Sequence, residues 1–145
     1  MKVLMQRVSS AKVTVAGQPV GAIGQGLLLL IGIERHDTHE LLQRMAHKVL
    51  NYRIFADDQG KMNLNVKAIG GGILAVSQFT LAAQTDKGLR PGFSGAAEPV
   101  LAQRLYQEFV EILAAQHSPV ATGVFAADMQ VSLVNDGPVT FMLEL

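Results

Sequence analysis

The run GLLLLIGI, from Gly26 to Ile33, restricts the fold of this chain more than any other feature. An apolar stretch of this length without alternation is typical of a strand that is covered on both faces. It is far too short to cross a bilayer. We therefore expect a sheet with other elements packed on each side of it.

The segments around this run have the patterns of strands and of two helices. Apolar side chains repeat at helical spacing over residues 38–51, where Asp37 is expected to cap the helix and Glu40 to complete a capping box. A second helix is expected from Pro99, a residue suited to a first turn, to near Gln116. Strands are expected within residues 2–33 and at 52–55, 73–81, 122–127, 129–134 and 138–145. The pattern predicts a layered mixed α/β fold with a single domain over residues 1–145.

Composition excludes several kinds of site. The chain has no cysteine, so disulfides, thiolate chemistry and cysteine-based zinc sites are excluded. Twelve basic and twelve acidic residues cancel, which argues against a wide contact with nucleic acid but allows the binding of one RNA end. The Leu/Ile run begins well inside the chain, and Arg7 and Lys12 interrupt the N-terminal segment, so we expect no signal peptide and a cytoplasmic protein.

Familiar catalytic and metal motifs are absent. There is no G-x-S-x-G, no set of Ser, His and acid at a recognisable spacing, and no P-loop. His36, His39 and His47 lack a carboxylate at a ligand spacing, so a solvated helix surface is favoured over a metal site.

The stretch SQFTL, Ser77 to Leu81, places polar residues at the end of an otherwise apolar strand. As a strand it would direct Ser77 and Phe79 to one side, and Gln78 and Thr80 to the other. Composition favours a strand edge entering solvent. The alternative is the floor of a pocket where hydroxyl and backbone N–H groups meet a substrate carbonyl. Thr80 would be a nucleophile only with a base beside it, and no base is evident.

The stretch VNDGPVTF, from Val134 to Phe141, has two interpretations. Asp136-Gly137 between apolar runs predicts a hairpin turn, the favoured interpretation. Pro138, however, removes a backbone donor where the return strand would begin to pair. Because a cis peptide costs little only before proline, a cis Gly-Pro that presents its two carbonyls as fixed acceptors is the alternative.

Taken together, these motifs resemble the bacterial D-aminoacyl-tRNA deacylase family almost from end to end. The resemblance is carried by MKVLMQRVSSAKVTV, GLLLLIGI, KMNLNVKAIGG, SQFTL, GLRPGFSGAA and NDGPVTFMLEL. SQFTL followed by a C-terminal NxGPVT is specific to this family. The resemblance implies a homodimer with a three-layer α/β/β fold and active sites at the subunit interface. It also implies that neither a metal nor an organic cofactor is needed. It implies hydrolysis of the ester between a D-amino acid, or glycine mischarged on tRNA(Ala), and the 3′-terminal ribose of tRNA.

The resemblance also implies roles for individual residues. Gly137 and Pro138, joined by a cis bond, would enter the partner's active site and crowd the position of an L side chain. The activity motif falls on Ser77, Gln78, Phe79 and Thr80, with N–H groups near Phe79 binding the substrate and the developing oxyanion. The resemblance further implies that the tRNA's own 2′-hydroxyl assists hydrolysis and that Thr80 lines the pocket without acting as a covalent catalyst.

Three supporting residues follow from the same resemblance. Arg7 would brace the Gly-Pro loop, while Met62 and Asn63 would line the adenosine side of the pocket. Leu89, Gly92 and Ser94 depart from the residues that are usual in the family. Two other functions remain open from the residues alone. One is a non-catalytic dimeric module that binds RNA ends or nucleotides, and the other is an esterase that uses Thr80 or Ser77.

Overall fold

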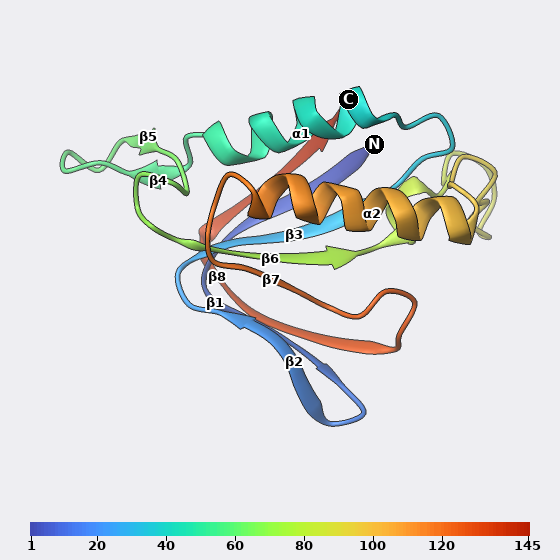
Figure 1. Cartoon of the computed structure of the whole chain (residues 1–145), viewed down its shortest axis with the longest axis horizontal. Helices are drawn as coiled ribbons and strands as arrows, with labels where there is room; N and C mark the ends of the chain where they lie inside the picture. The colour runs from blue at the N-terminus through green and yellow to red at the C-terminus, as the bar shows by residue number, and fades with distance from the viewer.

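The computed structural model describes all residues from 1 to 145, and it has a mixed α/β fold with two helices on one face of a strongly curved sheet (Figure 1). The strands are β1 (Lys2–Val15), β2 (Gln18–Ile23), β3 (Gly26–Gly32), β4 (Phe55–Ala56), β5 (Met62–Leu64), β6 (Gly72–Ser77), β7 (Val120–Thr122) and β8 (Met129–Glu144). The helices are α1 (His39–Asn51), a 3-10 helix (Phe79–Ala82) and α2 (Pro99–Ala114). None of them is long and apolar enough to cross a membrane.

The sheet is organised around the long strand β1. Its order is β2-β1-β3-β6-β7, and β8 pairs with the other edge of β1. β2 and β3 pair with the same edge of β1, one after the other. β2 is antiparallel to residues 11–15 of β1, and β3 is antiparallel to residues 2–8. β3 then pairs in parallel with β6, and β6 with β7. β4 and β5 form a separate hairpin that extends to the left in Figure 1.

Alternate side chains of β3 and β6 enter two different cores. Leu27, Leu29 and Ile31 join the large core under α1 and α2, while Leu28 joins a smaller core with Leu74 of β6. The expectation that the Leu/Ile run is buried on both faces is confirmed. The smaller core lies where the sheet curls over itself and nearly closes into a barrel. There β2 crosses β7 so closely that a Cβ on Gly21 would stand 2.2 Å from the carbonyl oxygen of Thr122.

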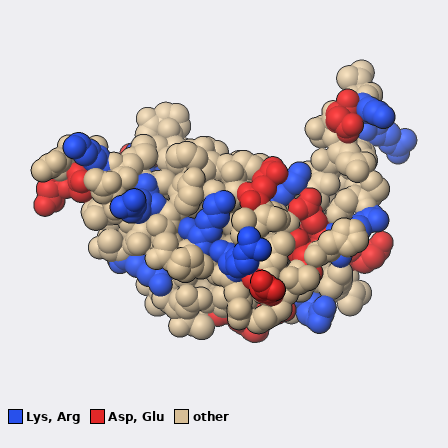
Figure 2. Space-filling model, turned by 90° about the horizontal axis from the view of Figure 1, so that it is seen from above, with Lys and Arg blue, Asp and Glu red and all other residues tan.

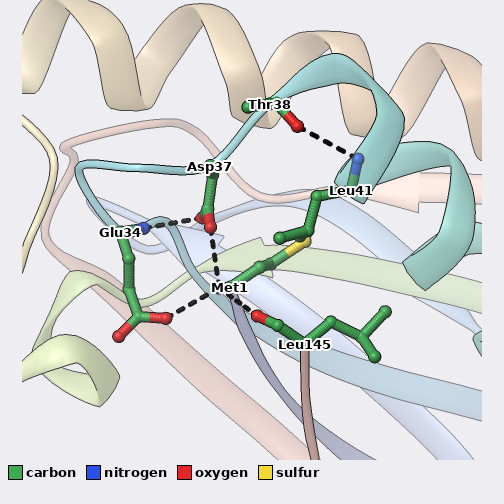
Figure 3. Close-up of polar contacts among 6 residues, drawn as sticks. All are labelled: Met1, Glu34, Asp37, Thr38, Leu41 and Leu145. Atoms are coloured by element: carbon green, nitrogen blue, oxygen red, sulfur yellow. Dashed lines mark hydrogen bonds and ion pairs between the residues drawn. The ribbon is translucent and has the colours of Figure 1, made fainter.

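The N-terminal ammonium ties three distant segments together (Figure 3). It donates to Glu34 Oε2 and to Asp37 Oδ1, both at 2.7 Å, and to the carbonyl oxygen of Leu145 at 3.0 Å. The Met1 side chain is buried in the large core. Asp37 Oδ2 also accepts from the backbone N–H of Glu34 at 2.7 Å. The start of β1, the end of β8 and the segment before α1 are therefore held at one point.

This contact explains why the predicted cap of α1 was wrong. The N-cap is Thr38, whose Oγ1 accepts from the N–H of Leu41 at 3.3 Å. Both oxygens of Asp37 are already engaged by Met1 and Glu34, so Asp37 forms no capping box with Glu40.

Three predicted strands differ from the observed ones. The predicted strand 52–55 shares only Phe55 with the short strand β4. The predicted strand 73–81 ends at Ser77, because its partner β3 ends one residue after the pair Ile31↔Ser77, and the chain turns into the 3-10 helix. SQFTL therefore does not alternate between two faces. The predicted strand 122–127 was wrong except at Thr122, because β7 covers Val120–Thr122 and a turn follows, in which the N–H of Ala127 donates to the carbonyl of Val124 at 3.2 Å.

The predicted hairpin at Asp136-Gly137 was also wrong. β8 continues along β1 on both sides of this point, from Gln6↔Thr140 to Val8↔Asn135. Residues 136–139 thus lie opposite Arg7 alone. They form a long bulge, and the two strands pair on both sides of it. Pro138, which lacks an N–H, is accommodated there because bulged residues leave the ladder.

Candidate active site

The first half of the candidate site lies where β6 ends. Ser77 is the last residue of the strand, and Phe79 and Thr80 begin the 3-10 helix. The helix's first hydrogen bond is donated by Leu81 to the carbonyl of Gln78, at 3.2 Å. The N–H groups of Phe79 and Thr80 precede it and find no acceptor within the helix, so they form a small cluster of donors at a strand end.

A cavity of about 470 Å³ opens beside this strand end. Ser77, Gln78 and Phe79 form one wall, and α2 and the segment Phe125–Ala127 form the others. The lining is mostly apolar, and the volume is in the range of small-molecule sites. It includes no histidine and no acidic residue. The hydroxyl of Thr80 accepts a hydrogen bond from the Gln78 side-chain amide, and it donates none to a histidine or a carboxylate.

The long loop between the 3-10 helix and α2 stands at the mouth of this cavity. Phe79, which is 57% exposed, has its ring centroid 5.2 Å from that of Phe93. Hydrogen bonds close the loop at its base. Gln84 and Gly92 exchange backbone hydrogen bonds of 2.7 and 3.0 Å, and Ser94 Oγ donates to Gln84 Oε1 at 2.9 Å. Its tip carries the fully exposed Leu89. Ser94 and Gly92 thus both contact Gln84.

The second half of the candidate site is the bulge in β8. Arg7 Nε donates to the carbonyl oxygen of Asp136 at 2.8 Å, and Arg7 Nη1 donates to the carbonyl of Ile54 at 2.6 Å. Asn135 Oδ1 accepts from the N–H of Val139 at 2.6 Å. The Gly137–Pro138 bond is cis, and both residues are exposed. A guanidinium fork and one amide therefore hold this backbone in place.

Met62 and Asn63 lie on the β4–β5 hairpin, which follows Ile54, and neither lines the cavity beside Ser77. Met62 is 48% exposed. Asn63 Nδ2 donates to Asp57 Oδ2 at 2.8 Å. This bond, with the N–H groups of Lys61 and Gln59, lowers the pKa of the Asp57 carboxyl below its usual value.

Within one chain the two halves are far apart. Sheet register aligns the bulge with Arg7, Arg7 with Leu27, and Leu27 with Ile73, and Ser77 lies four residues further along β6. Three strand spacings of about 4.8 Å and four residues of about 3.3 Å give a separation on the order of 20 Å. The structure therefore groups Ser77, Gln78, Phe79 and Thr80 at one place, and Arg7, Gly137 and Pro138 at another.

Residues that the sequence did not single out complete the cavity. They include Phe125, Ala126 and Ala127, whose apolar pattern predicts a strand and gives no signal of a pocket. Tyr106 lies behind them and donates its hydroxyl to the carbonyl of Ala75 at 2.9 Å. Burial raises the pKa of Tyr106 to about 12. No group of three or more His, Asp or Glu side chains is placed to hold a metal ion.

The charges suit a limited contact with nucleic acid. Figure 2 shows Lys and Arg side chains interspersed with acidic ones over the face that the helices cover, without one broad basic area.

Comparison with known proteins decides the family. The profile of the family described as D-Tyr-tRNA(Tyr) deacylase matches residues 4–144. The chain belongs to this family. D-aminoacyl-tRNA deacylases of Saccharophagus degradans and Alcanivorax borkumensis are 68% and 64% identical to it over 145 residues, which is the full length of both chains in each comparison. As a member of this family the chain is an enzyme, a hydrolase with D-aminoacyl-tRNA deacylase activity.

Two solved structures have the same fold. One, described as a c-Myc DNA unwinding element binding protein, is 43% identical with a TM-score of 0.95, and the match covers 100% of this chain and 99% of the other. The second, a probable eukaryotic D-amino acid tRNA deacylase, has a TM-score of 0.86 over 99% of this chain and 98% of its own. At 17% identity, the second shows only that the family's fold is shared.

Proposed function

We propose that the chain, a single domain over residues 1–145, acts as a cytoplasmic homodimer that removes D-amino acids from tRNA and spares L-aminoacyl-tRNA. One observation supports this proposal most directly. The cavity beside Ser77 has no side-chain base, and the bulge in β8 of the same chain lies too far away to reach it. A second copy supplies the bulge that completes each cavity. The two helices, the main sheet and its curled part then form the three layers of each protomer.

Hydrolysis in this cavity relies on positioning and on backbone donors. An aminoacyl ester is already activated, so a few N–H groups that bind the developing oxyanion can suffice. The N–H groups at Phe79 and Thr80 have the position for that role at the end of β6. Ser77 and Gln78 line the cavity and fix the ester. The 2′-hydroxyl of the terminal ribose assists, and neither metal nor cofactor takes part.

The bulge at Gly137 and Pro138 acts as the chirality filter. Its carbonyl oxygens enter the partner's cavity and occupy the space that an L side chain would need. Glycine has no side chain to reject, so glycine mischarged on tRNA(Ala) is also released. Three contacts support a fixed filter: those of Arg7 with Asp136 and Ile54, and that of Asn135 with Val139.

The free edge of β8 supports the dimer. β8 pairs only with β1, so its other edge offers unpaired backbone groups on either side of the bulge. Val134, Phe141 and Met142 of the same strand are exposed and apolar. Such an edge with apolar side chains is suited to a second copy.

The terminal adenosine of tRNA would occupy the cavity between α2 and Phe125. Met62 and Asn63 would approach the adenosine from the partner, because Arg7 joins the bulge to Ile54, the residue directly before their hairpin. Lys87 and Arg90 at the tip of the long loop would meet phosphates of the 3′ end.

Incubation of the purified protein with D-Tyr-tRNA and L-Tyr-tRNA tests the proposal. We expect rapid loss of the D-ester and no loss of the L-ester beyond its spontaneous rate. Equal loss of both esters would contradict the chirality filter, and survival of both would contradict the catalytic function.

The second candidate is a non-catalytic dimeric module that binds nucleic acid ends. The description of one similar structure as a DNA unwinding element binding protein favours it. The net charge of zero and the mixed charges on the face that the helices cover count against it. This candidate predicts that the protein binds tRNA without an amino acid and leaves the ester of D-Tyr-tRNA intact.

A further inference from the structure

A second hollow adjoins the cavity beside Ser77. It has a volume of about 630 Å³ and lies between α2 and the segment that follows β7. The two hollows share Phe125, whose ring centroid is 5.9 Å from that of Tyr106. A ligand that extends out of the first cavity past Phe125 therefore enters this hollow, which we call the α2 groove.

The α2 groove carries hydrogen-bonding side chains without partners in the protein. Gln103, Gln107 and Glu111 are spaced by four residues on one exposed face of α2, and Thr122 stands opposite at the end of β7. None of these four side chains makes a hydrogen bond or ion pair within the chain. By contrast, two other polar side chains of the same helical region are engaged: Glu108 pairs with His39, and Gln116 donates to the carbonyl of Ile112.

We propose that the α2 groove binds the penultimate nucleotide of the tRNA, a cytidine, while the terminal adenosine occupies the cavity beside Ser77. The inference rests on the proposed function, because it takes the aminoacylated 3′ end as the ligand of that cavity. It extends the substrate site by one nucleotide and assigns a role to residues of α2 that do not contact the ester.

The donors and acceptors of the groove match those of cytosine. The Glu111 carboxylate accepts from the exocyclic amine, and the Gln107 amide donates to the ring nitrogen or the carbonyl of the base. Uracil presents a carbonyl where cytosine has its amine, so it would face the carboxylate without a hydrogen bond. The groove therefore favours cytosine over uracil.

The position of Phe125 suits two consecutive nucleotides. The aromatic ring borders both hollows, and bases bound from a single strand commonly stack on such rings. Recognition of one base by neutral and acidic side chains needs no basic surface, in agreement with the balanced charge of the chain.

Calorimetric titration with three non-hydrolysable analogues tests the inference. Each has D-tyrosine in amide linkage to a 3′-amino-adenosine, either alone or preceded by cytidine (CpA) or by uridine (UpA). We expect the CpA analogue to bind about tenfold more tightly than the adenosine analogue, from one matched base contact, and the UpA analogue to bind no more tightly.

Glu111→Ala should remove the gain of the CpA analogue and leave binding of the adenosine analogue unchanged, which also shows that the variant is folded. The matched control is Glu108→Ala, on the same helix but directed at His39, and it should keep the gain. Equal affinity of wild type for the adenosine and CpA analogues would overturn the inference and leave the proposed function intact. A gain that survives Glu111→Ala would overturn it as well. If the adenosine analogue itself did not bind, both the assignment of the cavity beside Ser77 as the substrate site and this inference would be wrong.

Discussion

Gly137 has a backbone that other residues rarely adopt. Its φ is +141°, in the region where L side chains are strained. A Cβ there would stand 2.7 Å from Val139 Cγ2 and 3.1 Å from Arg7 Nη2. Both neighbours help to hold the bulge, so they have little freedom to move away. The geometry at this residue thus depends on the absence of a side chain.

Gly137→Ala should lower the free energy of unfolding by about 1–3 kcal/mol, because strain and crowding act together. Urea denaturation measures the change. Gly24→Ala is the control, since a Cβ there meets nothing within 4 Å. If both variants lost the same stability, the bulge would not be held as described.

At the scale of elements, the turn from β6 into the 3-10 helix determines the chemistry. It gathers backbone donors beside the cavity and places Thr80 next to Gln78 instead of a base. A side-chain nucleophile would need a proton acceptor that this turn does not supply.

Thr80→Ala should therefore keep substantial deacylation of D-Tyr-tRNA, with less than about a tenfold loss, whereas removal of a covalent nucleophile costs on the order of 10⁶ in kcat. Single-turnover rates measure the effect, and Ser77→Ala gives the same comparison for the other hydroxyl. Complete loss in either variant, with an unchanged unfolding midpoint, would identify that residue as a nucleophile.

The elements that sequence could predict are those with a regular pattern. The helical spacing of residues 38–51, the first turn at Pro99 and the doubly covered Leu/Ile run gave two helices and a central strand. The end of the strand at Ser77 could not be predicted, because it depends on where β3 stops. The proposed members of the site come from the family resemblance and stay a prediction, whereas the distance between its two parts depends on sheet register.

Contacts between distant residues account for the other errors. Asp37 is drawn from its capping role by Met1, 36 residues away in sequence. The bulge is braced by Arg7, which is 129 residues from Asp136. Local rules for Asp-Gly-Pro favour a turn because they do not include such partners.

At the scale of the whole molecule, the Met1 ammonium fastens both ends of the chain to the segment before α1. That segment also contacts the loop at the mouth of the cavity, since the N–H of Arg35 donates to the carbonyl of Gly95 at 3.2 Å. The side chain of Asp37 is only 3% exposed. Loss of its charge would leave the ammonium with Glu34 as its one carboxylate partner.

Asp37→Asn should lower the free energy of unfolding by about 2 kcal/mol, because a nearly buried ion pair loses one partner. Asp58→Asn, at an exposed position, should change it by less than about 0.5 kcal/mol. Denaturant titration of both variants gives the comparison, and equal stability of the two would contradict the role of the ammonium.

The central claim is that the cavity of one chain is completed by the bulge of another. Because the chain has no cysteine, a double variant Phe79→Cys/Asp136→Cys tests it directly under mild oxidation. A disulfide needs Cα atoms within about 7 Å, far less than the separation of these positions in one chain. We predict a covalent dimer on a non-reducing gel, absent from either single variant. A disulfide within one chain, or none at all, would contradict the account.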